Sequence, residues 1–138
     1  MRRAGAVRKA QRADDVASSP IGLLIHPDHG LWHAYRGAFL FPVEVAGLPA
    51  VGTRLSPCLT CADRPCLSTC PVDAVRLTGG TVTHYDVAAC TGHVHSGSSP
   101  HCLDDGCAAR RACPVAADGR YGPDQMRFHM EAFAGAHP

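Results

Sequence analysis

The sequence contains eight cysteines, and all of them lie between residues 56 and 117 of the 138-residue chain. Cysteine thiolates are strong ligands for iron and zinc, whereas in secreted proteins cysteines pair as disulfides. The chain begins MRRAGAVRKAQRADDV, a basic start without the apolar stretch of a secretory signal. We therefore expect a protein of the reducing cytoplasm, in which the cysteines bind metal.

The cysteines form two runs, and each run ends in Cys-Pro. The runs are Cys58-x2-Cys61-x4-Cys66-x3-Cys70-Pro71 and Cys90 followed by Cys102-x4-Cys107-x5-Cys113-Pro114. In bacterial proteins, two copies of the pattern C-x2-C-x2-C-x3-C-P bind two [4Fe–4S] clusters, and the cysteine before each proline ligates the cluster of the other copy. Proline fixes φ and has no N–H, so it turns the chain away directly after a ligand. The spacing thus predicts two [4Fe–4S] clusters with four cysteine ligands each.

Four gaps depart from this compact pattern. Cys61 and Cys66 are separated by four residues rather than two, and Cys90 stands alone. The gap from Cys102 to Cys107 is also stretched, and five residues rather than three precede Cys113. At the second site a [3Fe–4S] cluster or a labile iron therefore remains an alternative. Structural zinc favours paired C-x2-C knuckles, of which the chain has one, at Cys58 and Cys61. Disulfides are the third alternative.

The layout resembles the two-cluster bacterial ferredoxin module, and more closely the iron–sulfur region of cobalamin-dependent epoxyqueuosine reductases. Those proteins have an apolar hairpin similar to PIGLLIHPDHGLWHAYRGAFLF, an isolated cysteine after a Tyr-Asp pair (here Tyr85-Asp86 before Cys90) and a final Cys-Pro. Short bacterial ferredoxin-like proteins share the phrases CADRPCL, ARRACP and FHMEAF. The resemblance covers residues 17–134.

The resemblance implies the ligand sets of both clusters. It assigns Cys58, Cys61, Cys66 and Cys113 to the first cluster, and Cys70, Cys90, Cys102 and Cys107 to the second. In the reductases, the clusters feed electrons to a cobalamin in a separate preceding domain. Because about 19 residues precede Pro20 here, we expect that domain to be absent or to belong to a partner chain.

Other side chains near the cysteines have simpler expected roles. The nine histidines include His93, His95 and His101, which lie between Cys90 and Cys102, and His26, His29 and His33, which surround a predicted turn. The first three could bind metal or replace a thiolate, but loop histidines are more often solvated or donate to sulfur. We expect the second three to be surface or packing residues. Asp63, Asp73, Asp104 and Asp105 are predicted caps and turn formers. No catalytic set is predicted.

The chain divides into four segments: a polar, helical segment at 1–19, an apolar hairpin extension at 20–55, a dicluster ferredoxin-like module at 56–117 and a C-terminal helix at 118–138. The hairpin would join 21–26 to 31–41 through the Pro27–Gly30 turn, with a bulge at Gly37. A helix over Leu31–Phe41 is the alternative. Gly79-Gly80 predicts a second, smaller hairpin.

The predicted C-terminal helix begins at Pro123 and is closed by Gly135. Its apolar stripe (Met126, Met130, Phe133 and Ala134) is expected to be packing. The resulting fold class is α+β: a ferredoxin-like two-[4Fe–4S] module with an N-terminal β-hairpin extension and a C-terminal helix.

These features predict an iron–sulfur electron carrier rather than an enzyme. The alternative is an electron-feeding subunit, or remnant, of an epoxyqueuosine-reductase-like oxidoreductase; a structural zinc protein and a redox sensor fit less well. The net charge is +1 and the arginines are scattered, so no nucleic-acid partner is expected. No window approaches the ~18 apolar residues of a membrane span. We expect redox partner proteins, and an apolar face of residues 20–41 left bare for one of them.

Overall fold

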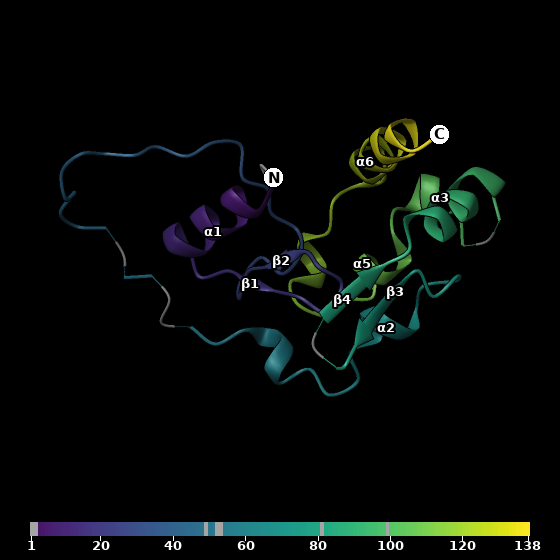
Figure 1. Cartoon of the computed structure of the whole chain (residues 1–138), viewed down its shortest axis with the longest axis horizontal. Helices are drawn as coiled ribbons and strands as arrows, with labels where there is room; N and C mark the ends of the chain where they lie inside the picture. The colour runs from purple at the N-terminus through teal and green to yellow at the C-terminus, as the bar shows by residue number, and fades with distance from the viewer. Residues whose placement is uncertain (1–2, 49, 52–53, 81, 99) are drawn as a thin grey trace.

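The computed structural model describes residues 3–48, 50–51, 54–80, 82–98 and 100–138. This part of the chain is a small mixed α/β protein with two antiparallel sheets of two strands each and six α-helices. The sheets and the short helices form a central body, and the C-terminal helix lies along one side of it (Figure 1).

The N-terminal segment contains one helix and a very short hairpin. Helix α1 (Arg3–Ala13) leads into β1 (Ala17–Ser18), which pairs with β2 (Leu24–Ile25). An isolated bridge between His26 and Gly30 then closes the turn that follows β2. Helical structure in the first nineteen residues was expected, and α1 provides it.

The hairpin expected between residues 21–26 and 31–41 is wrong, and so is the alternative helix over Leu31–Phe41. Leu24–Ile25 pair instead with β1, which precedes them in the chain, and residues 31–41 are left without a partner strand among the described residues. Leu31 and Trp32 are buried in the body, and residues 33–48 have neither helix nor strand. No bulge forms at Gly37. Figure 1 shows this segment as a long loop that extends past α1 and away from the sheets.

The cysteine-rich part consists of short elements. In chain order they are η1 (Pro57–Leu59), α2 (Pro65–Ser68), β3 (Val75–Thr78), β4 (Val82–Tyr85), α3 (Val87–Ser96), α4 (Cys102–Asp105) and α5 (Ala108–Arg111). The hairpin predicted at Gly79-Gly80 is confirmed, because β3 and β4 pair from Val75↔Tyr85 to Thr78↔Val82. Both glycines have positive φ, as a tight turn between two strands requires.

Helix α3 occupies part of the segment where a loop was expected after Cys90. Asp86 caps its first turn, since its side chain accepts a hydrogen bond of 2.9 Å from the Ala89 N–H. The helix ends at Gly97, whose φ of 65° lies in the left-handed region. The cap signal at Asp86 precedes VAACTGHVHS, a stretch with weak helical periodicity, and this is why the sequence favoured a loop.

Helix α6 (Pro123–Ala136) follows the 3-10 turn η2 (Ala117–Gly119) and confirms the predicted C-terminal helix. It starts with proline in its first turn as expected, but it runs through Gly135 instead of closing there. It packs on α4 and α3. Ala134 is buried and Met130 packs against the same core, so these two members of the apolar stripe of the helix are packing residues.

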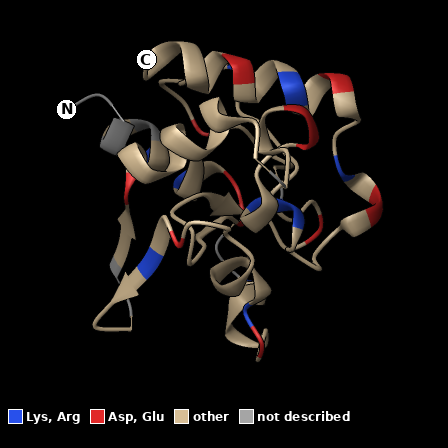
Figure 2. Ribbon diagram, turned by 90° about the vertical axis from the view of Figure 1, so that its right-hand side faces the viewer, with Lys and Arg blue, Asp and Glu red and all other residues tan. Residues whose placement is uncertain are grey.

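The apolar core is split into two small clusters. One gathers Val94, Cys102, Ala108 and Ala134 under α6, and the other gathers Ile25, Leu31 and Cys113. Cysteines thus belong to both cores. Among the described residues, no helix is long and apolar enough to cross a bilayer. Acidic and basic residues are interspersed along the ribbon, for example on the helix that ends at the C-terminus (Figure 2).

Candidate metal centres

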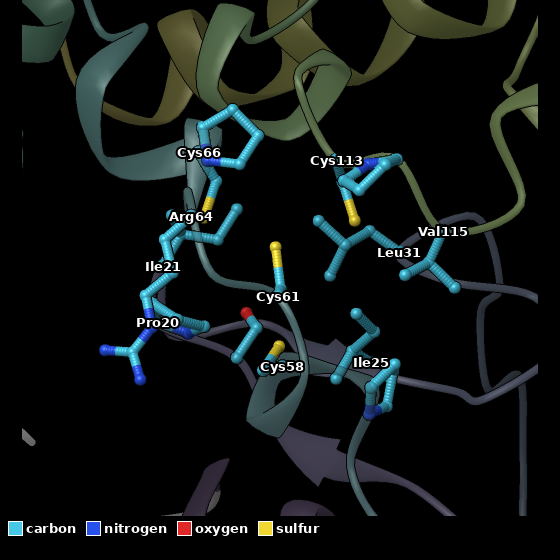
Figure 3. A pocket seen from close by; sticks show the side chains of 14 residues that line it. Pro20, Ile21, Ile25, Leu31, Cys58, Cys61, Arg64, Cys66, Cys113 and Val115 are labelled. Atoms are coloured by element: carbon cyan, nitrogen blue, oxygen red, sulfur yellow. The ribbon is translucent and has the colours of Figure 1, made fainter.

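Four cysteines line one pocket, which we call the first site: Cys58, Cys61, Cys66 and Cys113. The space among the lining atoms amounts to about 370 Å³ with open solvent included, and the cavity that a water-sized sphere can occupy is about 20 Å³. The sulfur atoms of all four cysteines point into this space (Figure 3). Three of the cysteines come from the first run, and the fourth is the Cys-Pro cysteine of the second run.

Local structure explains how these thiols reach one pocket. Ser56 caps η1 and thereby fixes the turn that carries Cys58. Cys66 lies on α2, which begins after Arg64, a residue with a φ of 40°. Cys113 follows α5, and α2 contacts α5. The two runs therefore meet through these two short helices.

The N-terminal segment forms the opposite wall of the first site. Pro20 and Ile21 from the β1–β2 turn line it, together with Ile25 and Leu31 (Figure 3). These side chains are apolar, and Ile25 and Leu31 are almost completely buried. The wall therefore keeps one side of the pocket dry.

The thiols of the first site influence one another electrostatically. Burial raises the pKa of Cys66, and the neighbouring charges of Cys58 and Cys113 raise it further. The pKa of Cys58 is also raised, first by burial and then by Cys113 and Cys61, whereas a hydrogen bond with Ser56 opposes the shift. Four thiolates in this pocket would repel one another, so the charged form needs a bound cation or a metal cluster.

The other four cysteines form a second group, which we call the second site: Cys70, Cys90, Cys102 and Cys107. Burial raises the pKa of Cys90, and so do the charges of Cys70 and Cys102. Burial likewise raises the pKa of Cys107, with smaller contributions from Cys102 and Cys90. The electrostatic neighbours of these thiols are thus the remaining members of the second predicted ligand set.

Hydrogen-bond donors surround the thiols of the second site. The Ala74 N–H donates to Cys70 Sγ over 3.3 Å. The backbone N–H groups of Arg110 and Ala109 lower the pKa of Cys107, opposing its burial. Tyr85 is hydrogen-bonded to Cys90, and burial followed by this bond raises the pKa of the tyrosine. Such donors stabilise sulfur in its charged form.

The histidines after Cys90 bond to backbone carbonyls. His93 Nε2 lies 3.0 Å from the Pro100 carbonyl, and His95 Nε2 lies 3.4 Å from that of His137. His101 precedes α4 without capping it through its side chain. Within the described ranges, no group of three or more His, Cys, Asp or Glu residues is arranged to hold a single metal ion.

The remaining predicted polar residues have structural contacts. His26 Nδ1 accepts hydrogen bonds from the N–H groups of Asp28 and His29, and its Nε2 lies 3.4 Å from Asp14. His26 and His29 stack, with His33 at the edge of His26. The predicted aspartates Asp104 and Asp105 pair with Arg127 and Arg111, and Asp73 adopts a positive φ in a turn; for Asp63 the structure shows no capping contact.

Three residues near the sites were missed by reasoning from the sequence: Ser19, Arg110 and Asp86. Asp86 had a readable signal, because Asp before a helix is a common cap. Ser19 and Arg110 had none, because their roles depend on contacts between distant segments.

All eight cysteines are free of disulfide bonds. Comparison of the chain with protein-family models, curated proteins and solved structures found no match in any of the three.

Proposed function

We propose that this protein binds two [4Fe–4S] clusters and transfers single electrons. The observation that carries the proposal is the grouping of eight free cysteines into two sets of four, with the Cys-Pro cysteine of each run in the set of the other. This crossover is the ligand arrangement of the bacterial two-cluster pattern. Cys113 crosses to the first site and Cys70 to the second.

The donor chemistry and spacing favour a cluster over zinc. Four sulfurs at ~2.3 Å from one tetrahedral ion lie only about 3.8 Å from one another. In a [4Fe–4S] cluster each thiolate binds a different iron, so the sulfurs surround a larger body. Among the described residues, no group of three or more His, Cys, Asp or Glu side chains is arranged to hold one ion, whereas four cysteines line the pocket of the first site.

When bound, each cluster supplies a centre that gains and loses one electron. The chain's own residues hold and insulate it. Ile25 and Leu31 exclude water from the first site, and the N–H of Ala74 and the hydroxyl of Tyr85 donate to thiolates of the second site. We propose that the protein works in the cytoplasm.

A redox partner protein is part of the proposal, and the loop after Tyr35 is its docking segment. Large apolar side chains protrude from this loop, and Phe39 is 90% exposed. The others are Leu40, Phe41, Val43, Val45, Leu48, Val51 and Leu55. Exposed apolar side chains in such number mark interaction surfaces. A cofactor-bearing chain of an epoxyqueuosine-reductase-like oxidoreductase is the second candidate, since the start of this loop belongs to the segment that resembles the hairpin of the reductases.

Anaerobic purification with metal and sulfide analysis tests the proposal. We expect iron and acid-labile sulfide in equal amounts, and two interacting S = ½ signals in the EPR spectrum of the reduced protein. Zinc without sulfide, or a metal-free chain after anaerobic reconstitution with iron and sulfide, would overturn it.

A further inference from the structure

We infer that the hydroxyl of Ser19 donates a hydrogen bond to a sulfur of the metal centre at the first site and thereby tunes its reduction potential. This inference rests on the proposed function. It adds a residue outside both cysteine runs to the machinery of the site.

The side chain of Ser19 is buried without a partner. The residue is only 5% exposed, and its Oγ makes no hydrogen bond among the described residues. Buried hydroxyls normally have a partner, because losing hydrogen bonds to water is unfavourable. A donor in this position indicates that its acceptor is a group that binds to the protein.

Ser19 belongs to the lining of the pocket that the sulfurs of Cys58, Cys61, Cys66 and Cys113 face. Its neighbours in the same wall, Pro20 and Ile21, have apolar side chains that offer no acceptor. Trp32 Nε1 is also buried without a partner, but Trp32 is not part of this lining. Two buried polar atoms of the described residues thus lack a partner, and Ser19 Oγ is the one that belongs to a residue lining the first site.

The backbone around Ser19 holds the hydroxyl in place. Its N–H donates to the Leu23 carbonyl over 2.8 Å, and its own carbonyl accepts from the Gly22 N–H over 2.9 Å. Both backbone groups are thus used in the turn between β1 and β2. Only the hydroxyl remains available, and the turn fixes the serine at the wall of the pocket.

A donor at this point affects reduction because the reduced centre carries one more negative charge. Hydrogen bonds to sulfur stabilise that charge and raise the reduction potential. Replacement of Ser19 by alanine removes the donor without adding volume. The potential of the first centre should fall while the four thiol ligands stay in place.

The test is a redox titration of the holoprotein followed by EPR, with iron and sulfide content measured on each sample. Ser19→Ala should change the equilibrium constant for reduction of one centre three- to tenfold. For a one-electron couple, this lowers its midpoint potential by about 28 to 59 mV. Ser19→Thr, which keeps the hydroxyl, should restore the wild-type value.

Ser68→Ala is the matched control, because Ser68 is exposed, follows Cys66 closely and already donates to the Pro65 carbonyl. It should leave both potentials unchanged. Intact clusters with unchanged potentials in Ser19→Ala would overturn the role of Ser19 and leave the proposed function standing. Absence of iron and sulfide from the wild-type protein would instead overturn the proposed function and this inference with it.

Discussion

The guanidinium of Arg110 lies over the indole ring of Trp32, 4.7 Å from its centroid. It also lies 4.9 Å from the centroid of the neighbouring Tyr121 ring, and its Nε donates to the Leu31 carbonyl over 3.1 Å. Arg110 comes from α5, between the two last cysteines. It therefore fastens the N-terminal wall of the first site to the helix that precedes Cys113.

Replacing Arg110 should loosen this wall. Arg110→Ala removes two charged hydrogen bonds to the Leu31 carbonyl and two cation–π contacts, and we expect a loss of about 2–4 kcal/mol in the free energy of unfolding. Denaturant unfolding of the holoprotein under anaerobic conditions measures it. Arg111→Ala is the control, because the Arg111 side chain forms an exposed pair with Asp105 at 4.0 Å, and the loss of this pair should change the free energy of unfolding by less than about 0.5 kcal/mol. Equal effects of the two variants would contradict the role of Arg110.

Cross-ligation should appear in a series of cysteine variants. Cys113→Ala is expected to damage the same EPR signal as Cys58→Ala, because both thiols face the first site. Cys70→Ala should instead share its phenotype with Cys102→Ala. Iron content and EPR of the reduced variants distinguish the two groupings. If Cys113→Ala matched Cys102→Ala, each run would bind its own cluster and the proposed ligand sets would be wrong.

Tyr85 should tune the second centre. Tyr85→Phe removes the hydroxyl that bonds to Cys90 but keeps a ring that can stack on Phe133. We expect the potential of one centre to fall by about a three- to tenfold change in the reduction equilibrium, and that centre is the one Ser19→Ala leaves unchanged. Tyr35→Phe is the control, since the Tyr35 hydroxyl donates to Asp14. An unshifted potential in Tyr85→Phe would remove the tyrosine from the second site.

Gly30 should not tolerate a side chain. Its φ is +55°, and an added Cβ would collide with the carbonyl oxygen of Val115. Gly30→Ala is expected to destabilise the protein by about 2–3 kcal/mol, because neither backbone can move easily. Gly37→Ala has nothing within 4 Å of the added Cβ and should be neutral or slightly stabilising. Thermal unfolding of both variants measures the difference. An unchanged melting temperature in Gly30→Ala would show that the backbones at Gly30 and Val115 are not in contact.

The stability of the N-terminal wall should fall as the solution becomes mildly acidic. Burial lowers the pKa of His33 below its ordinary 6.5, although the hydrogen bond with the Gly30 carbonyl opposes this shift. The unfolded chain therefore takes up the proton first. The stability that neutral His33 contributes is complete above pH 6.5 and is lost as the pH falls through the folded value.

Denaturant midpoints measured between pH 7.5 and 5.5 should show this slope, and His33→Gln should make it shallower. His95→Gln, on the exposed side of α3, is the control and should keep the wild-type slope. The interpretation is wrong if His33→Gln is as pH-sensitive as the wild type.

The sequence predicted the elements whose signals are local. Gly79-Gly80 between β-prone stretches and Pro123 before an apolar stripe were sufficient for the β3–β4 hairpin and for α6. The crossed grouping of the cysteines came instead from the resemblance to the two-cluster ferredoxin pattern, in which the cysteine before proline ligates the other cluster.

What failed depended on distant contacts. Residues 31–41 follow a strong turn signal and were therefore expected to form a strand. Their conformation depends instead on β1, which pairs with Leu24–Ile25, and on Arg110, which contacts Trp32. Ser19 is unremarkable in sequence and becomes informative only when the turn buries it beside the thiols of the first site. Tertiary competition of this kind leaves no periodic trace in the chain.

The first site joins the β1–β2 turn, the first cysteine run and the end of the second run, stretches that lie far apart along the chain. Bringing them together closes long loops, and the entropy of closure must be overcome before any local contact compensates for it. A metal cluster held by Cys58 and Cys113 would act as a cross-link that restricts the unfolded ensemble, as a disulfide does.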